Sequence, residues 1–203
     1  MPTHQIPGDF LDFVKETCAR NGIKLKIGRG KSVVMKPFGF RVLGYFDEGG
    51  SILACASGGS AQDFLSTLVH EFAHVLQWIE GDKTYKFCDH RKYGSVQNAV
   101  CMWINNEITL NNKILIRYTQ KMIDCELNAE RRAVKLIKEF NLPIDLDIYK
   151  SKASAVLYSY WVSIKTKKWD AKIGKKQMAA SGRSLKRSFR SLPKNVERSF
   201  IGA

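Results

Sequence analysis

Four segments of the chain place apolar residues three and four positions apart, the spacing of one face of an α-helix. The clearest covers residues 61–80, and Gly81 follows it as a C-terminal cap would. The same pattern predicts helices over 8–21, 116–140 and 146–165. Residues 82–112 show no sustained period, so we expect mostly loop there, with one short helix near 96–104.

Three short apolar runs, at residues 23–27, 40–46 and 51–56, predict β-strands. The last two are joined by Asp-Glu-Gly-Gly, and a glycine pair suits a hairpin turn. We expect three antiparallel strands, with those at 40–56 beside the helix over 61–80. The fold class predicted is α+β: a small antiparallel sheet packed on one central helix, with further helices around it.

The composition indicates one folded domain with a basic extension. The chain has 203 residues, of which 44% are hydrophobic, enough for a core. Its net charge of +14 is unevenly spread: residues 150–203 hold 14 Lys or Arg against two acidic residues. We therefore predict a domain over 1–169 and, over 170–203, a basic tail with no core of its own. Such a tail favours binding to nucleic acid or another polyanion.

Other features bear on location. No apolar run approaches the length of a membrane span, and the first ten residues lack the order of a signal peptide. The five cysteines are widely spaced without CxxC pairs, which suits reduced thiols. A cytoplasmic protein without a membrane span is expected, and the sequence predicts no oligomeric state.

The strongest chemical signal is His70-Glu71-Phe72-Ala73-His74, an HExxH motif within the predicted helix 61–80. Residues four apart on a helix point the same way, so both imidazoles can bind one Zn²⁺ ion. Glu71 follows the first histidine directly and is placed to contact a zinc-bound water, which it can activate for attack on a carbonyl. The sequence therefore predicts a zinc site with Glu71 as its catalytic residue.

Catalytic zinc usually has a third protein ligand, and two candidates compete for the position. Glu126 lies on the predicted helix 116–140, where it shares a face with Glu130. The rival is His90, in a predicted loop. A donor to the reaction's oxyanion is also expected, and His90, Tyr118 and Tyr149 are candidates. Helical placement favours Glu126 as the ligand.

These motifs resemble a known family. HExxH followed on a later helix by ExxxE is similar to the gluzincin branch of the zincin metallopeptidases. The blocks HEFAHVLQW, CELNAERRAVKLIKEFNLPID and YKSKASAVLYSYW also resemble metallopeptidases encoded by tailed bacteriophages. The resemblance implies that Glu126 is the third zinc ligand and that Glu130 hydrogen-bonds a zinc-binding histidine. It also implies a zincin-like fold and, if the protein is phage-encoded, the host cytoplasm.

We therefore expect a zinc metallopeptidase, a hydrolase that cleaves peptide bonds with a zinc-bound water activated by Glu71. A peptide or protein would be its substrate, bound along the edge strand of the sheet. Two alternatives remain. One is a zinc-containing nucleic-acid-associated or phage structural protein that binds through its basic tail. The other is a SprT-like DNA-associated protease, in which His90 would be the third ligand.

Overall fold

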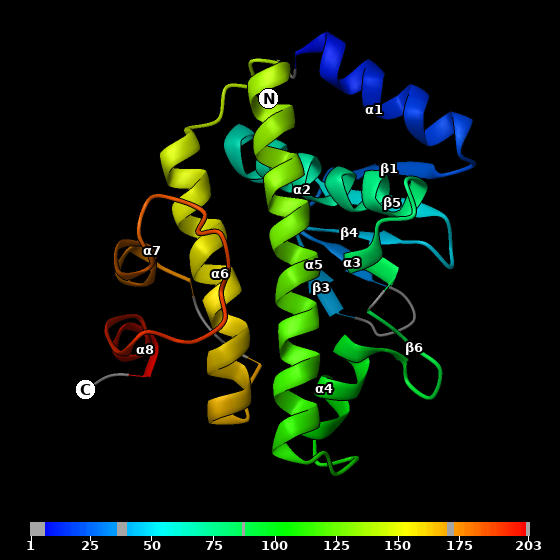
Figure 1. Cartoon of the computed structure of the whole chain (residues 1–203). Coiled ribbons are helices and arrows are strands. Elements are labelled where there is room, and N and C mark those ends of the chain that lie inside the picture. Colours follow the sequence, from blue (N-terminus) through cyan, green and yellow to red (C-terminus); the bar gives the residue numbers. More distant parts are fainter. Residues whose placement is uncertain (1–6, 36–39, 87, 170–172, 202–203) are drawn as a thin grey trace. The chain divides into compact units, whose positions relative to one another are not determined.

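The structure is a computed structural model that describes residues 7–35, 40–86, 88–169 and 173–201. Its helices and small sheets make an α+β protein, as predicted (Figure 1). The chain forms two compact units. The first comprises the chain up to Asp82 together with Ala129–Ile144, and the second comprises Lys83–Asn128 and the chain from Asp145 onward. Within the described ranges, no helix has the length and apolar character needed to cross a membrane.

The first unit contains the two N-terminal helices predicted from the sequence. Helix α1 (Gly8–Arg20) buries Phe10, Val14 and Cys18. Helix α2 (Ala61–Ile79) begins after Ser60, whose hydroxyl accepts a hydrogen bond of 3.0 Å from the backbone N–H of Asp63. Gly81 has a φ of +63°, the left-handed conformation that ends many helices. Both ends of α2 are thus fixed by local capping interactions.

The sheet of the first unit differs from the prediction in strand direction. Its order is β1 (Lys24–Gly28), β5 (Ile52–Ala56) and β4 (Gly44–Asp47). Strands β4 and β5 are antiparallel, as expected, but β1 runs parallel to β5. The prediction of three antiparallel strands is therefore wrong for β1. An apolar run signals a strand but carries no information on its direction.

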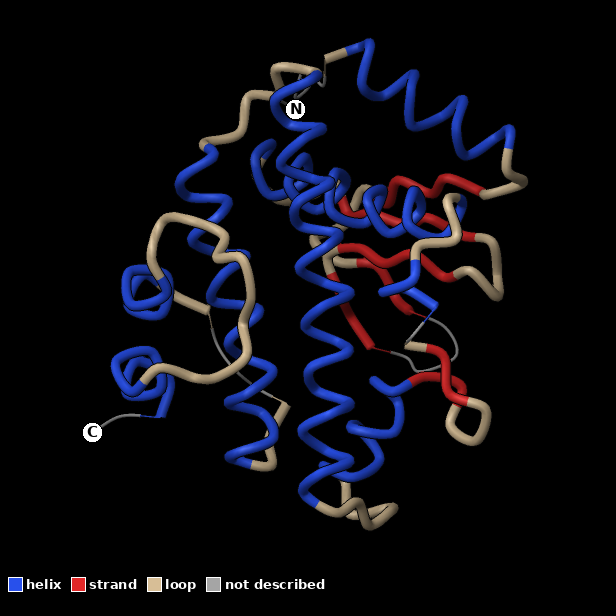
Figure 2. The backbone as a smooth tube through the Cα atoms, viewed as in Figure 1, coloured by secondary structure: helices blue, strands red, loops and turns tan. Residues whose placement is uncertain are grey.

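The predicted strand over 40–46 is two strands. Residues Phe40–Val42 form β3, which pairs with β2 (Val33–Met35) in a separate antiparallel sheet. Residues after Leu43 form β4 of the three-stranded sheet. Strand β2 was not predicted, since three residues are too few for an alternating pattern to stand out. Figure 2 shows the strands of both sheets in red.

The turn between β4 and β5 uses its glycines differently from a standard hairpin. Neither Gly49 nor Gly50 has a positive φ, whereas Ser51 has a φ of +48°. Gly50 instead lies close to the Asp47 side chain, since a Cβ there would lie 2.5 Å from an oxygen of that carboxylate. That carboxylate also accepts a hydrogen bond from the Gly50 N–H at 3.1 Å. The hairpin is confirmed, with Asp47 closing its turn.

Helix α2 packs directly against β4 and β5, as predicted for the strands at 40–56 (Figure 1). The approach is close at Gly44 on β4, where a Cβ would lie 2.5 Å from the Thr67 methyl group of α2 and 3.1 Å from the Cys55 sulfur of β5. Farther along, Phe46 and Trp78 pack edge to face with ring centroids 5.9 Å apart. Strand β4 and the helix that carries the HExxH motif therefore lie in direct contact.

The second unit is mainly helical. It contains α3 (Lys83–Lys86), the short hairpin β6 (Asp89–His90) and β7 (Gly94–Ser95), and α4 (Val96–Ile104). The short helix predicted near 96–104 is thus confirmed. Helix α5 (Asn112–Glu139) starts one turn earlier than predicted and contributes residues to both units. Helix α6 (Leu146–Thr166) agrees with its prediction and is capped by Asp145.

The chain beyond residue 170 was expected to be a tail without a core. Its described part instead folds against α6 through α7 (Lys175–Ser181) and α8 (Lys194–Ile201). Phe189 is 1% exposed, with its ring 4.8 Å from that of Tyr158. Leu185 and Leu192 pack on the same cluster. Composition alone underestimates the tendency of this segment to fold. A few apolar residues are enough for folding when a neighbouring helix supplies the rest of the core.

Candidate metal centre

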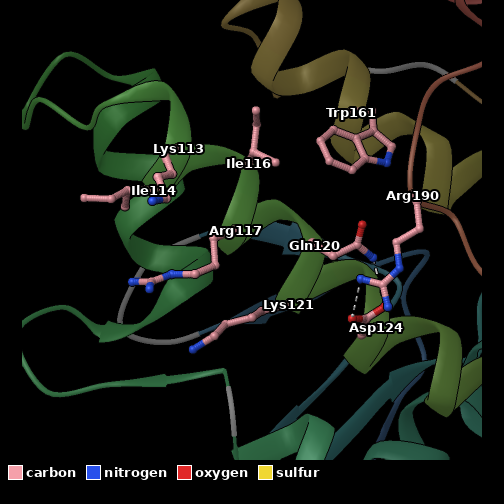
Figure 3. A pocket seen from close by; sticks show the side chains of 9 residues that line it. All are labelled: Lys113, Ile114, Ile116, Arg117, Gln120, Lys121, Asp124, Trp161 and Arg190. Atoms are coloured by element: carbon pink, nitrogen blue, oxygen red, sulfur yellow. Dashed lines mark hydrogen bonds and ion pairs between the residues drawn. The ribbon is translucent and has the colours of Figure 1, made fainter.

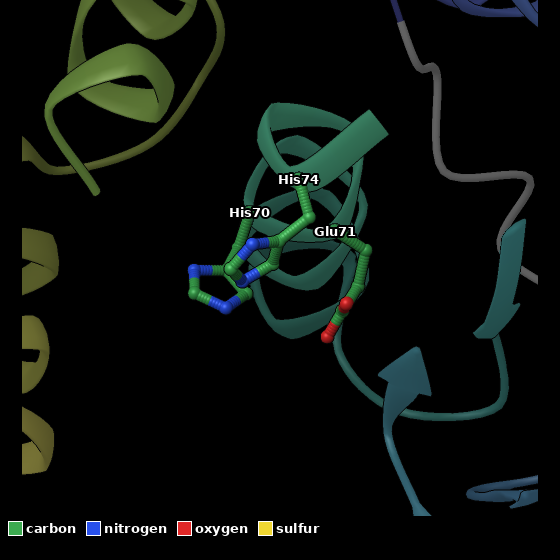
Figure 4. Close-up of side chains that lie close together, drawn as sticks. All are labelled: His70, Glu71 and His74. Atoms are coloured by element: carbon green, nitrogen blue, oxygen red, sulfur yellow. The ribbon is translucent and has the colours of Figure 1, made fainter. Parts of the chain in front are cut away.

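The HExxH residues lie together on α2. His70, Glu71 and His74 each place one possible ligand atom within 4.8 Å of the others, and Figure 4 shows their side chains gathered on one side of the helix. The two imidazoles meet edge to face, with ring centroids 4.8 Å apart and planes at 88°. All three side chains are partly buried. This group could hold a metal ion.

His74 is oriented by Gln77, a residue outside the HExxH motif. Its Nδ1 lies 2.8 Å from the side-chain oxygen of Gln77, which is fully buried. An amide oxygen only accepts, so Nδ1 carries the proton and Nε2 carries the lone pair. A metal-binding histidine typically donates its other N–H to an oxygen in this way. The three-residue spacing on α2 is the signal that could have identified Gln77.

His70 has a similar contact with a different helix. Its Nδ1 lies 3.1 Å from a carboxylate oxygen of Glu130, whose side chain is only 8% exposed. A carboxylate favours the proton on the nitrogen nearest to it, which again leaves the lone pair on Nε2. The resemblance implied that Glu130 would contact one of the two histidines, and it lies beside His70. Its role next to a bound metal stays a prediction.

An ion-pair cluster fixes this part of α5 to the end of α2. Arg132 contacts the Glu80 carboxylate at 2.6 Å and the Asp82 carboxylate at 3.1 Å. The guanidinium is 23% exposed and Asp82 is 15% exposed, so water screens these contacts less than those of a fully exposed pair. Arg132 lies two residues after Glu130. The cluster therefore helps to hold the segment of α5 that carries Glu130 against the end of α2.

The charge of Glu71 reaches a buried thiol on β5. Burial, and then the negative charges of Glu71 and Cys18, raise the pKa of Cys55 well above its ordinary value. Cys55 is completely buried. Its thiol therefore stays protonated at neutral pH, whereas a metal-binding cysteine must be a thiolate. The donors available in the group are imidazole nitrogens and carboxylate oxygens, a set that fits zinc.

His90 and Tyr118, the alternative candidates, lie together in the second unit. His90 Nδ1 accepts hydrogen bonds from the backbone N–H groups of Lys92 and Tyr93, at 3.1 and 3.3 Å. Its Nε2 therefore carries the proton and donates to the Tyr118 hydroxyl at 2.6 Å. In this arrangement neither nitrogen of His90 offers a lone pair to a metal. The geometry weighs against His90 as the third ligand.

Glu126 lies on α5, one helical turn before Glu130, and is partly buried. Residues four apart on a helix share a face, so the two carboxylates project from the same side of α5. Glu126 belongs to the second unit and Glu130 to the first. The assignment of Glu126 as a third ligand stays a prediction.

No protein-family model matches the chain, and comparison with curated proteins and with solved structures finds no significant similarity. The resemblance to gluzincins therefore rests on the motif residues and on their geometry in this chain.

Proposed function

We propose that this protein is a zinc metallopeptidase whose metal is bound by His70, His74 and Glu126. The observation that carries the proposal is the arrangement of the two histidines. Each has its Nδ1 against an oxygen acceptor, from Gln77 or Glu130, and both rings lie beside the Glu71 carboxylate. This arrangement is the one expected when both Nε2 atoms bind a metal. An incidental pair of surface histidines would not need two buried acceptors.

A zinc ion at this site would supply a Lewis acid that polarises a peptide carbonyl and lowers the pKa of water. Glu71 would act as the general base. Its carboxylate sits one residue after His70 and can take a proton from the attacking water, then return it to the leaving amine. Gln77 accepts the Nδ1 proton of His74, and the Glu130 carboxylate lies 3.1 Å from Nδ1 of His70, so both contacts favour the tautomer that leaves Nε2 with the lone pair.

The strand beside the metal helix suggests the substrate class. Among the described strands, β4 lies at an edge of the three-stranded sheet, and it packs on α2. An edge strand offers backbone N–H and C=O groups to an extended peptide. We therefore propose a peptide or protein substrate. The supporting feature is the close approach of Gly44 to the Thr67 methyl group of α2, which leaves room for this strand to lie directly against the helix that carries the HExxH residues.

A peptide-cleavage assay with Glu71→Gln tests the proposal. The zinc-loaded full-length protein should cleave members of a mixed fluorogenic peptide library. Glu71→Gln should lower the rate by at least about 100-fold, because general-base catalysis contributes that much, and should still bind zinc. The control is Glu139→Gln, which removes an exposed carboxylate at the end of α5 and should leave the rate unchanged. Equal cleavage by Glu71→Gln, or no cleavage by the zinc-loaded protein, would contradict the proposal.

A further inference from the structure

The second unit carries nearly all of the protein's net charge. It holds 21 Lys and Arg against 8 Asp and Glu, a net charge of +13, whereas the first unit is close to neutral at +1. The unit also contains a hollow of about 590 Å³ formed by α5, α6 and the segment between α7 and α8. A concentration of positive charge around a concave surface attracts polyanions.

Three of the cations at this hollow come from one face of α5. Lys113, Arg117 and Lys121 line it at intervals of four residues, which corresponds to about 6 Å per step along the helix. Such a row can follow the backbone of an extended single strand of nucleic acid, with one basic side chain contacting each phosphate. Figure 3 shows the three side chains in order along α5.

A fourth cation comes from the chain beyond residue 170. Arg190 lies 3.5 Å from the Asp124 carboxylate, and Asp124 also accepts a hydrogen bond of 2.8 Å from the Gln120 side chain. The Arg190 side chain is still 64% exposed. Asp124 therefore orients the guanidinium without removing it from solvent. It is the single acidic residue at the hollow, against four basic ones.

The hollow also has an apolar wall. Trp161 of α6 and Ile116 of α5 line it, and Ile116 is 52% exposed (Figure 3). The Trp161 indole N–H donates to the Phe189 carbonyl at 2.9 Å, which fixes the ring. A fixed aromatic ring and a row of cations that line one hollow can bind single-stranded nucleic acid, with a base on the ring and phosphates on the cations. Here Trp161 and Arg190 lie on one side of α5, and the Arg117 and Lys121 side chains extend from the other (Figure 3). An acidic peptide would bring carboxylates but no base to stack on Trp161.

We propose that this hollow binds single-stranded nucleic acid, with Trp161 stacking on a base and Lys113, Arg117, Lys121 and Arg190 contacting phosphates. The site does not include the HExxH residues, so the inference stands independently of the proposed peptidase activity. It places nucleic-acid binding in a folded hollow to which the segment beyond residue 170 contributes one arginine.

The test is the binding of a fluorescein-labelled 20-nucleotide oligothymidylate to the full-length protein, measured by anisotropy between 50 and 200 mM salt. Lys113→Ala/Arg117→Ala should weaken binding by at least about 10-fold. It should also reduce the slope of log K against log salt by about 1.4, the value for two lost phosphate contacts on a single strand. The matched control, Lys83→Ala/Arg91→Ala, removes one exposed lysine and one exposed arginine of the same unit, away from the hollow. It should weaken binding less than about threefold, since only long-range attraction is lost.

Trp161 is tested separately, because its replacement could also affect folding. Trp161→Leu should weaken binding at least about fivefold with an unchanged salt slope, and Trp161→Phe, which keeps a ring, should restore most of the affinity. Two results would overturn the proposal. One is equal weakening by the two double variants, which would mean diffuse attraction. The other is competition by poly-glutamate as effective as that by unlabelled oligonucleotide, which would make the hollow a site for acidic peptides.

Discussion

At the residue scale, the histidines of the candidate metal centre are oriented by the side chains next to their Nδ1 atoms. His74 is held by Gln77 of its own helix, and His70 by Glu130 of another helix. The two oxygen groups differ in charge and origin, yet each lies beside Nδ1 and so favours the proton on that nitrogen. A metal site requires the same tautomer in both rings, because the Nε2 lone pairs of both histidines must be available to one metal ion.

Replacement of Gln77 tests this arrangement. Gln77→Leu keeps the approximate size of the buried side chain but removes the acceptor, so we expect zinc affinity to fall about 10- to 100-fold. Gln77→Glu keeps an acceptor at the same position and should retain most of the affinity. The measurement is competition for zinc with a chromogenic chelator. If Gln77→Leu binds zinc as tightly as the wild type, Gln77 does not orient His74.

The sequence alone identifies only part of this site. Spacing predicts that His70 and His74 point the same way on one helix, and the structure places possible ligand atoms of both, and of Glu71, within 4.8 Å of one another. The three-residue spacing puts Gln77 beside His74 on the helix, but nothing in the local pattern marks this glutamine as fully buried. Its burial depends on long-range packing.

At the element scale, the contact between β4 and α2 determines where the metal helix sits relative to the sheet. Helices and hairpins were predictable because their signals are local: periodicity, caps and turn residues. The parallel pairing of β1 with β5 was not, because it depends on how the chain between them crosses the unit. The close approach of Gly44 to α2 was also not predictable from the sequence, because a glycine in a strand does not indicate which residue packs against it.

Gly44→Ala tests the importance of this approach. The added methyl group would clash with the Thr67 side chain, so β4 and α2 must separate, and we expect a loss of about 1–3 kcal/mol of unfolding free energy. The control is Gly49→Ala in the adjoining turn, where the nearest atom to a new Cβ is 3.5 Å away and the change should be small. Denaturant unfolding measures both. Equal stability of the two variants would show that the strand and the helix can separate without cost.

At the scale of the whole molecule, charge and chemistry are divided between the two units. The first unit holds the HExxH group and is nearly neutral, and the second holds almost all the excess positive charge. The sequence indicated a basic C-terminal region but placed the boundary at residue 169. The described part of that region is structural, since Phe189 is buried against Tyr158 of α6. Long-range packing, which composition cannot encode, accounts for the difference.

The buried thiols predict how stability changes at high pH. Burial raises the pKa of Cys18 from 9.0 to about 11. The unfolded thiol ionises near pH 9 and the folded one near pH 11, so the stability that is present below pH 9 is lost as the pH rises to 11. The loss from this group should be about 2–3 kcal/mol.

Urea unfolding at pH 8 and pH 11 measures this loss. Cys18→Ala should lose less stability over the same interval than the wild type, because it lacks the titrating thiol. An identical loss in the two proteins would contradict the assignment of the effect to Cys18.

Binding of one zinc ion by His70, His74 and Glu126 is tested most directly by metal content, measured by mass spectrometry on protein purified without added zinc. We expect one zinc per chain in the wild type and in His90→Ala, and its loss in His74→Ala and Glu126→Gln. A wild type without stoichiometric zinc, or a His74→Ala or Glu126→Gln variant that keeps it, would contradict this ligand set.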